Sequence, residues 1–309
     1  MDISAFQELY PFKSNYFDLD GLRYHYLDEG PREAQALVML HGNPTWSFYY
    51  RTLIPALTKA YRVIVPDHIG CGLSDKPQNY TYTLDQHIHN LERLLSSLGI
   101  KTLSLVLHDW GGAIGMGYAV RFHEYVRQFV ILNTAAFSVP VMPLRIEICR
   151  VPFIGEMIVR GCNGFAKAAL RFATSQPQRF TPQVKSGYLA PYNSWKNRIA
   201  VHRFVKDIPM NARHPSWGTL KRIEQELPRF RNHPMLILWG EDDFCFTVDD
   251  VLPEWQIRFP QAETHLLKNA GHYVVEDAHE RLLPLIEEFL QNKEFPHRRQ
   301  GSSLIRHED

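Results

Sequence analysis

The sequence predicts an α/β fold in which helices flank a mostly parallel central sheet and a helical segment is inserted over it. Short, continuously apolar runs alternate along the chain with helical periodicities, as expected for parallel strands that are covered on both faces. This alternation stops between about residues 137 and 217 and then resumes. With 309 residues, of which 45% are hydrophobic, the chain is long enough to bury the core of such a fold.

The first elements are two strand-like runs, YFDLD and LRYHYLDE, at residues 16–28 with Gly21 at the bend between them. We expect them to form an antiparallel hairpin. Six further runs are short and rich in β-branched residues or leucine, which is typical of parallel strands. These runs are ALVMLHG (36–42), YRVIVPD (61–67), TLSLVLHD (102–109), VRQFVILN (126–133), MLILWG (235–240) and AETHLLK (262–268).

Helical segments lie between these runs. Residues 83–99 begin at Thr83, a candidate N-cap, carry apolar side chains on one side and stop at Gly99. Residues 280–291 have the same periodicity and form the last predicted helix. The alternation of strands and helices predicts right-handed crossovers between parallel strands.

The break in the alternation predicts the domain organisation. We expect residues 1–136 and 218–294 to form the two parts of one core, residues 137–217 a helical cap and residues 295–309 a mobile polar tail. A separate helical domain is the alternative for the segment from 137 to 217. The insertion is favoured because the strand-like run that follows this segment must rejoin the same sheet.

The predicted cap is both apolar and basic. Between Leu144 and Phe172 five basic residues face two acidic ones, so this surface either is solvated or docks on a membrane or a partner. Its apolar side chains either pack the cap onto the core or form the roof of a pocket for an apolar substrate. The candidates for this roof are Phe137, Phe153, Met157, Ile158, Phe165, Leu170 and Phe172.

Charge and cysteine content exclude several classes of function. The 34 lysines and arginines almost balance the 33 aspartates and glutamates, so no global field attracts nucleic acid. The four scattered cysteines form neither a CxxC pair nor a metal-ligand pattern, which predicts reduced thiols, no bound metal and a cytoplasmic location. Because neither a secretory signal nor 18 consecutive apolar residues is visible, we expect an unprocessed chain without a transmembrane segment.

Asp109 stands where a predicted strand gives way directly to a predicted helix, in the stretch VLHDWGG. Such a sharp turn exposes its central side chain at the carboxyl edge of the sheet, and Gly111 and Gly112 would let the turn tighten. The backbone N–H of Trp110 would point to the same space. This pattern predicts a nucleophile elbow with an attacking aspartate, although an aspartate that merely caps the helix is an alternative.

Three other polar positions follow predicted strands and belong to the same edge of the sheet. Asn43, in HGNPTW, supplies a side-chain amide and a nearby backbone N–H as donors. His272 precedes the last helix and is a candidate base, with Gly271 giving it room. Asp243 is its candidate partner through the second ring nitrogen, and Asp242 is the near competitor.

Five motifs in this order resemble the haloalkane dehalogenase family of α/β-hydrolases over about residues 20–292. They are HGNPTWSFYYR, PDHIGCGLSDKP, LHDWGG, LWGEDD and AGHYVVEDA. The resemblance implies an α/β-hydrolase fold with an inserted helical cap. It also implies a catalytic triad with Asp109 as the nucleophile, His272 as the base and Asp243 as the acid.

The resemblance further implies that Asn43 and Trp110 hold the leaving halide. In one branch of the family the acid is a glutamate just after the strand that corresponds to VRQFVILN. Here this stretch continues with Asn133 and two small residues, so the acid should be Asp243. That choice resembles the branch that also contains the β-lactone decarboxylases of long-chain olefin synthesis.

The implied reaction is cleavage of a carbon–halogen bond. An aspartyl-alkyl ester forms on Asp109, and water activated by His272 hydrolyses it. Aspartate suits this chemistry because the ester has a carbonyl that water can attack, whereas the ether formed by a serine would have none. We expect a small apolar substrate and no cofactor.

Three alternatives stay open. A β-lactone decarboxylase would use the same residues to release an alkene and carbon dioxide, and that branch implies a homo-oligomer or an assembly with olefin-pathway enzymes. An epoxide hydrolase would need two cap tyrosines, for which Tyr188 and Tyr192 are available. A protein of this fold that only binds its ligand is the third, but such proteins often lack one catalytic residue.

Overall fold

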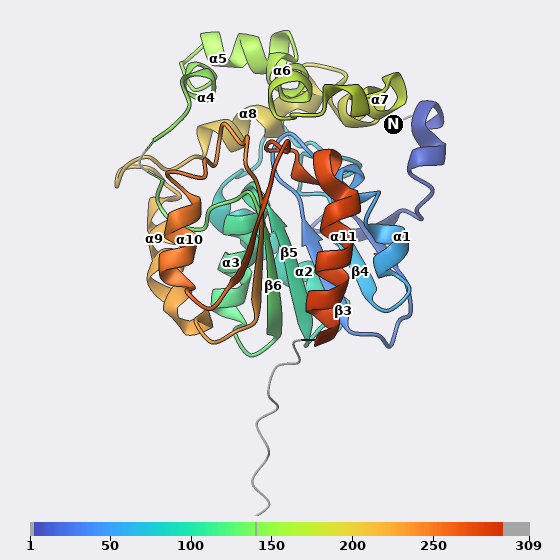
Figure 1. Cartoon of the computed structure of the whole chain (residues 1–309). Coiled ribbons are helices and arrows are strands. Elements are labelled where there is room, and N and C mark those ends of the chain that lie inside the picture. Colours follow the sequence, from blue (N-terminus) through green and yellow to red (C-terminus); the bar gives the residue numbers. More distant parts are fainter. Residues whose placement is uncertain (1–2, 140, 293–309) are drawn as a thin grey trace, which may run out of the picture.

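The computed structural model describes residues 3–139 and 141–292. Eight strands of this part of the chain form one sheet in the order β1-β2-β4-β3-β5-β6-β7-β8, and helices cover both of its faces (Figure 1). The strands are β1 (Asn15–Leu19), β2 (Leu22–Glu29), β3 (Ala36–Leu40), β4 (Arg62–Pro66), β5 (Leu103–His108), β6 (Val126–Leu132), β7 (Met235–Gly240) and β8 (Glu263–Leu267). The fold is therefore the predicted α/β-hydrolase fold with a mostly parallel sheet.

The pairing of the strands agrees with the expected topology. The strand β1 pairs with β2 in an antiparallel hairpin, and β2 pairs in the same way with β4. All other neighbours in the sheet are parallel. Most predicted runs extend one or two residues beyond the observed strands, because their last residues, such as Asp67, Asp109 and Asn133, already belong to the loops at the carboxyl edge.

The helices of the described residues differ widely in length. They are α1 (Ile54–Leu57), α2 (Leu84–Ser97), α3 (Trp110–Arg121), α4 (Leu144–Ile148), α5 (Ile154–Glu156), α6 (Gly164–Phe172), α7 (Pro182–Leu189), α8 (Ile199–Lys206), α9 (Trp217–Glu226), α10 (Leu252–Arg258) and α11 (Val274–Asn292). Short 3-10 helices include η1 (Ser4–Leu9) and η2 (Ser47–Tyr50), and η3 (Met157–Gly161) is a π-helix. None of the helices in the described part of the chain combines the length and the apolar character needed to cross a bilayer.

Two predicted helix starts can be compared with the structure. Thr83 is the N-cap of α2, as predicted, and its side chain accepts a hydrogen bond from the backbone N–H of Gln86. The prediction for the last helix was too short, because α11 begins at Val274 rather than at residue 280. Its first turn buries Val274 and Val275 and is separated from the rest by a kink at Ala278.

The continuous hydrophobicity of the parallel strands follows from burial on both faces of the sheet. In β5, Leu105 belongs to the apolar cluster that the helices α2, α3 and α9 cover, whereas its neighbour Val106 belongs to the cluster on the opposite face, under α11 and η2. Successive strand residues point to opposite faces, so both sets must be apolar.

The chain returns to the same sheet after the long helical segment, since β7 pairs in parallel with β6. The helices α4 to α8 lie together at one end of the sheet, and α9 lies lower, beside α3 (Figure 1). These positions suit the expected insertion, and the boundaries at residues 137 and 217 stay a prediction. The predicted tail, residues 295–309, lies outside the described residues.

Candidate active site

Asp109 lies in the turn between β5 and α3 with a φ of 50° and a ψ of −124°. A positive φ is rare for a residue other than glycine and is strained, as expected at a nucleophile elbow. Its side chain makes no capping hydrogen bond to α3, so helix capping does not account for the aspartate. The side chain points instead into a cavity at the carboxyl edge of the sheet.

Two backbone N–H groups face the Asp109 carboxylate. The N–H of Asn43 donates to Oδ1 over 2.6 Å, and the N–H of Trp110 also favours the charged carboxylate and lowers its pKa. Gly42 makes this approach feasible, because a Cβ at this position would lie 1.9 Å from the Asp109 Oδ1 atom. Burial raises the pKa of the Asp109 carboxyl, against the opposing effects of the His272 imidazole and of these two amides.

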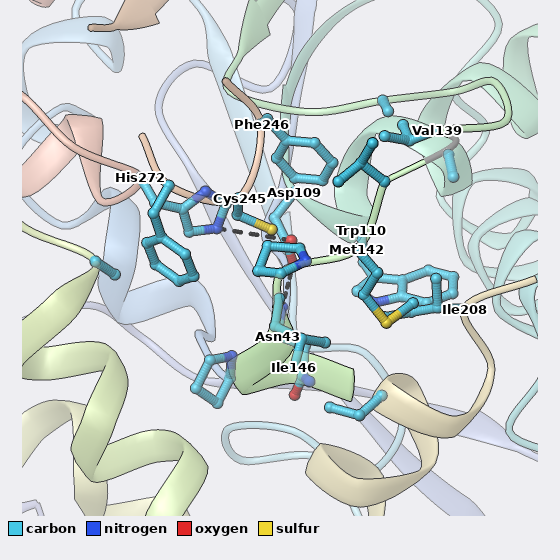
Figure 2. Close-up of a pocket in the computed structure, with 18 of the residues that line it drawn as sticks. Asn43, Asp109, Trp110, Val139, Met142, Ile146, Ile208, Cys245, Phe246 and His272 are labelled. Carbon is cyan, nitrogen blue, oxygen red and sulfur yellow. Dashed lines mark hydrogen bonds and ion pairs between the residues drawn. The ribbon is translucent and has the colours of Figure 1, made fainter. Parts of the chain in front are cut away.

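His272 lies between two carboxylates, as the sticks in Figure 2 show for the Asp109 side. Its Nε2 atom is 3.6 Å from the Asp109 Oδ2 atom, and its Nδ1 atom is 2.9 Å from the Asp243 Oδ2 atom. Burial lowers the pKa of the imidazole, but the charges of Asp243 and Asp109 outweigh it, so the net pKa is raised. The structure thus brings the three residues of the predicted triad together.

The carboxylate of Asp243 is buried and held by several donors. Its Oδ2 atom accepts from the side-chain amide of Asn133 over 2.9 Å, and its Oδ1 atom accepts from the backbone N–H groups of Cys245 and Phe246. These bonds orient the carboxylate toward His272.

The competitor Asp242 makes a different contact. Its carboxylate accepts a hydrogen bond from the hydroxyl of Ser175 near the surface and does not reach His272. The geometry therefore selects Asp243. Sequence reasoning did not identify Asn133 as the further partner of Asp243, although an asparagine at the carboxyl end of a buried strand was a usable signal.

Asn43 and Trp110, the predicted anion-holding pair, both line the cavity that contains Asp109. The side-chain amide nitrogen of Asn43 donates to the carbonyl oxygen of Val201 in α8 over 3.1 Å, which leaves its second hydrogen. The indole of Trp110 packs against Phe204, 5.3 Å between ring centroids. The pair thus lies beside Asp109, with one amide hydrogen used to hold the helix α8.

The rest of the cavity is mostly apolar. Figure 2 shows Phe246 beside His272 and, on the other side of Asp109, the side chain of Ile208 near Trp110. The thiol of Cys245 also lines the cavity, a position that sequence reasoning missed because the residue is not part of a cysteine motif.

Of the seven candidates for the roof of the cavity, two line it and five do not. Phe137 and Phe165 line the cavity. Phe153, Met157 and Phe172 are exposed on the outer side of the cap, and Ile158 and Leu170 pack into other apolar clusters. The helices here are too short for periodicity to reveal which face is buried.

The two cap tyrosines required by an epoxide hydrolase do not line the cavity. The hydroxyl of Tyr188 donates to the carboxylate of Glu276, and the hydroxyl of Tyr192 donates to the carbonyl oxygen of Thr45. Both are therefore structural contacts between the cap and the core. Within residues 3–139 and 141–292, no group of His, Cys, Asp and Glu side chains is arranged to hold a metal ion.

Known proteins resemble this chain along nearly all of its length. The family model of the alpha/beta hydrolase fold matches residues 35–149. Two cis-3-alkyl-4-alkyloxetan-2-one decarboxylases are similar. The protein of Shewanella oneidensis is 44% identical over 93% of this chain and 91% of its own length, and that of Xanthomonas campestris pv. campestris is 43% identical over 91% and 97%.

Haloalkane dehalogenases are less similar in sequence but share the architecture. Haloalkane dehalogenase 2 of Mycobacterium bovis is 31% identical over 93% of this chain and 98% of its own length. The crystal structure of the haloalkane dehalogenase DatA from Agrobacterium tumefaciens C58 superposes with a TM-score of 0.80 at 25% identity, covering 90% of this chain and 96% of that one. The chain belongs to the haloalkane dehalogenase family of α/β-hydrolases, in the branch that includes the cis-3-alkyl-4-alkyloxetan-2-one decarboxylases.

Proposed function

We propose that the protein is a β-lactone decarboxylase that converts a cis-3,4-dialkyl oxetan-2-one into a cis-alkene and carbon dioxide. One observation carries the proposal: the chain is 44% and 43% identical to two decarboxylases of this substrate class, and only 31% identical to a haloalkane dehalogenase of similar coverage. The dehalogenase expected from the motifs becomes the second candidate.

The cavity suits a substrate with two alkyl groups. Such a lactone carries one alkyl group on each of two adjacent ring carbons, so its two chains leave the reacting ring in different directions. Apolar side chains lie on both sides of Asp109, with Phe246 beside His272 and with Ile208 near Trp110 (Figure 2). Burial of both chains would supply the binding energy that holds the ring against the carboxylate.

In the first proposed step, a carboxylate oxygen of Asp109 attacks the ring carbon that bears the ring oxygen. The bond between that carbon and the ring oxygen breaks, and the electron pair goes to the oxygen, which becomes part of a free carboxylate. The product is an alkyl ester on Asp109. We favour this carbon over the carbonyl carbon, because attack at the carbonyl would leave an alkoxide at the position from which a leaving group must later depart.

In the second step, the new carboxylate loses carbon dioxide. The electrons of the bond between the carboxylate and its carbon form the alkene, and the ester oxygen leaves as the Asp109 carboxylate. Attack from the rear places the two departing groups opposite each other, so a cis lactone gives a cis-alkene. Atoms and charges balance without water, and Asp109 is restored.

His272 acts in this proposal as a cation rather than as a base. Because the carboxylates of Asp243 and Asp109 raise its pKa, its imidazolium form is favoured, with Nδ1 donating to Asp243. The proton on Nε2 would then stabilise the lactone oxygen that becomes a carboxylate. The amide of Asn43 and the indole N–H of Trp110 are the donors for the lactone carbonyl.

Dehalogenation would use the same residues in a different protonation state. Water would have to attack the Asp109 ester, and His272 would have to be neutral to accept the proton from that water. The similarity to haloalkane dehalogenase 2 and to the fold of DatA supports this candidate. An epoxide hydrolase is not supported, because Tyr188 and Tyr192 bind elsewhere.

The test compares two substrates with one set of variants. Wild type and Asp109→Asn are incubated separately with a cis-3,4-dialkyl β-lactone and with a bromoalkane of similar length, and alkene and bromide are quantified. The proposal predicts cis-alkene from the lactone with wild type and none with Asp109→Asn. Bromide release without alkene formation would identify the protein as a dehalogenase instead. Ser175→Ala is the matched control, because the Ser175 hydroxyl binds Asp242, which is outside the triad.

A further inference from the structure

The outer side of the cap carries a concentration of exposed apolar side chains. We define the outer cap surface as the exposed apolar residues between positions 141 and 157. They are Val141, Leu144, Ile148, Val151, Phe153, Ile154 and Met157. These residues belong to the segment around α4, α5 and η3, at the end of the molecule far from the base of the sheet (Figure 1). Large apolar residues gathered in this way mark an interaction surface, whereas single ones need no explanation.

Phe153 is the most exposed of these side chains, at 85%. It directly precedes α5 and has a φ of 61°, a strained conformation for a bulky residue. Packing within the protein does not explain this strain, since the ring lies in solvent. A ring held outward at the end of a turn is suited to enter an apolar phase outside the protein.

The charge around this surface is positive. Four cations in or next to α4 and α6 have no carboxylate within ion-pairing distance in the part of the chain that the structure describes. They are Arg145, Arg150, Lys167 and Arg171. In the same segment, Arg160 is paired with Glu156, which neutralises both.

The one acidic residue of this segment without an ion pair among the described residues is Glu147, in α4. The Arg145 guanidinium lies over the rings of Phe172 and Phe244, and Arg150 donates to the sulfur of Met142, so neither charge is neutralised. Four cations without an ion pair therefore outnumber one such anion, beside a group of exposed apolar side chains. This combination complements an anionic lipid surface, in which phosphate groups lie above an acyl layer.

The outer cap surface also leads to the active site. Val141 and Met142 line the cavity that contains Asp109, and they also line a neighbouring open hollow. The other residues of this hollow are Glu147, Arg150, Val151 and Met210. Val141 and Val151 are exposed at the same time. Val141 and Met142 thus connect the outer cap surface with the cavity that contains the reacting carboxylate.

We infer that the outer cap surface docks on an anionic lipid bilayer, with Leu144 and Phe153 in the acyl layer and the unpaired arginines and lysine at the phosphates. Docking would turn the mouth of the cavity toward the bilayer, into which an uncharged substrate with two alkyl chains partitions. The identity of that substrate rests on the proposed function, but the docking surface does not.

The experiment measures binding to lipid vesicles separately from catalysis. Full-length protein is sedimented with vesicles of phosphatidylcholine alone and of phosphatidylcholine mixed with phosphatidylglycerol. The variant Leu144→Ser/Phe153→Ser removes two apolar side chains that do not line the cavity. The matched control, Ile257→Ser/Leu266→Ser, removes two exposed apolar side chains from α10 and β8.

We expect wild type and control to bind the anionic vesicles, and the cap variant to bind them at least about tenfold more weakly. Raised salt should weaken the binding of wild type, since charge contributes. Further measurements keep the docking surface and the proposed function apart. Asp109→Asn should bind vesicles like wild type. The cap variant should keep the wild-type rate on a short, water-soluble β-lactone and the wild-type unfolding midpoint.

Two results would overturn the inference. Equal vesicle binding by wild type and the cap variant, or no binding by either, would show that the surface does not contact lipid. If wild type instead forms a dimer without lipid and the cap variant is a monomer, as measured by light scattering on a sizing column, the surface belongs to a second copy of the chain.

Discussion

Replacing Asp243 by asparagine should separate the two roles considered for His272. The substitution keeps the size of the side chain and an acceptor oxygen, but it removes the charge next to the Nδ1 atom of the imidazole. Burial then acts on His272 with less opposition, so its pKa falls. At neutral pH the variant therefore holds less of the imidazolium form that the proposed decarboxylation requires.

The distance in the structure sets the scale of the effect. For unit charges 2.9 Å apart, as in this pair, Coulomb's law with an effective dielectric constant of about 20 gives an attraction on the order of 6 kcal/mol. The asparagine oxygen retains part of it as a hydrogen bond. We therefore expect the turnover rate at pH 7 to fall by about three powers of ten, with a much smaller change in KM.

The assay is alkene formation from a cis-3,4-dialkyl β-lactone over a range of pH. The rate of Asp243→Asn should recover partly as the pH is lowered, because acid restores the imidazolium. Asp242→Asn is the matched control, since its carboxylate binds Ser175, and it should keep the wild-type rate. Wild type measured over the same pH range controls for protonation of the Asp109 carboxylate, whose pKa is raised by burial. A variant Asp243→Asn that becomes slower on acidification over a range in which wild type keeps its rate would refute the cationic role of His272.

Three further predictions concern the site and the core. The wild-type rate of decarboxylation should fall as the pH rises through the raised pKa of His272, since the imidazolium is lost there; a dehalogenase would gain rate instead. Gly111→Ala should lower the free energy of unfolding in urea by about 2 kcal/mol or more, since its Cβ would lie 2.1 Å from the carbonyl oxygen of Leu40. Arg51→Met should lower the same free energy by about 3 kcal/mol, since it leaves the buried carboxylate of Glu276 without its cation.

Matched variants control for the last two of these predictions. Gly218→Ala, in α9, adds a Cβ with nothing within 4 Å and should not destabilise the protein. Arg23→Met breaks an exposed pair with Asp75 and should cost less than about 1 kcal/mol. If each control destabilised the protein as much as its partner variant, neither close packing nor burial of the charge would explain the loss.

The fold could be predicted because its signals are local. Continuous apolar runs identify strands that are buried on both faces, and the order of runs and helices leaves few topologies. Asp109 could be singled out for a similar reason, since it ends a strand-like run and is followed, after Trp110, by the two glycines that let a turn tighten. The helix-cap alternative for Asp109 needed the structure to decide it. The sequence signal for the N-cap at Thr83 is also local, since it depends only on the residues around the start of α2.

Side-chain directions in the cap could not be predicted. Phe153 and Phe165 look alike in the sequence, yet one lies in solvent and the other lines the cavity, because their short helices carry too few turns for a periodic pattern. The pairing of Arg51 with Glu276 was also inaccessible, since it joins positions 225 residues apart. The choice between Asp242 and Asp243 needed the resemblance, and the geometry agrees with it.

The choice between decarboxylation and hydrolysis could not be made from the catalytic residues. Both reactions use an aspartate, a histidine and an anion-holding pair, and they differ in whether water attacks the ester. The residues that line the cavity are compatible with both reactions. Similarity along the whole chain was needed to favour the decarboxylase.

The most direct test of the account follows Asp109 through one turnover in water enriched in heavy oxygen. Enzyme in excess over the lactone is quenched in acid at successive times, and the peptide that contains Asp109 is weighed. We predict a transient adduct with the full mass of the lactone, followed by return to the original mass as the alkene appears. Alkene formation without an adduct, or an Asp109 peptide that gains heavy oxygen from water, would contradict the account.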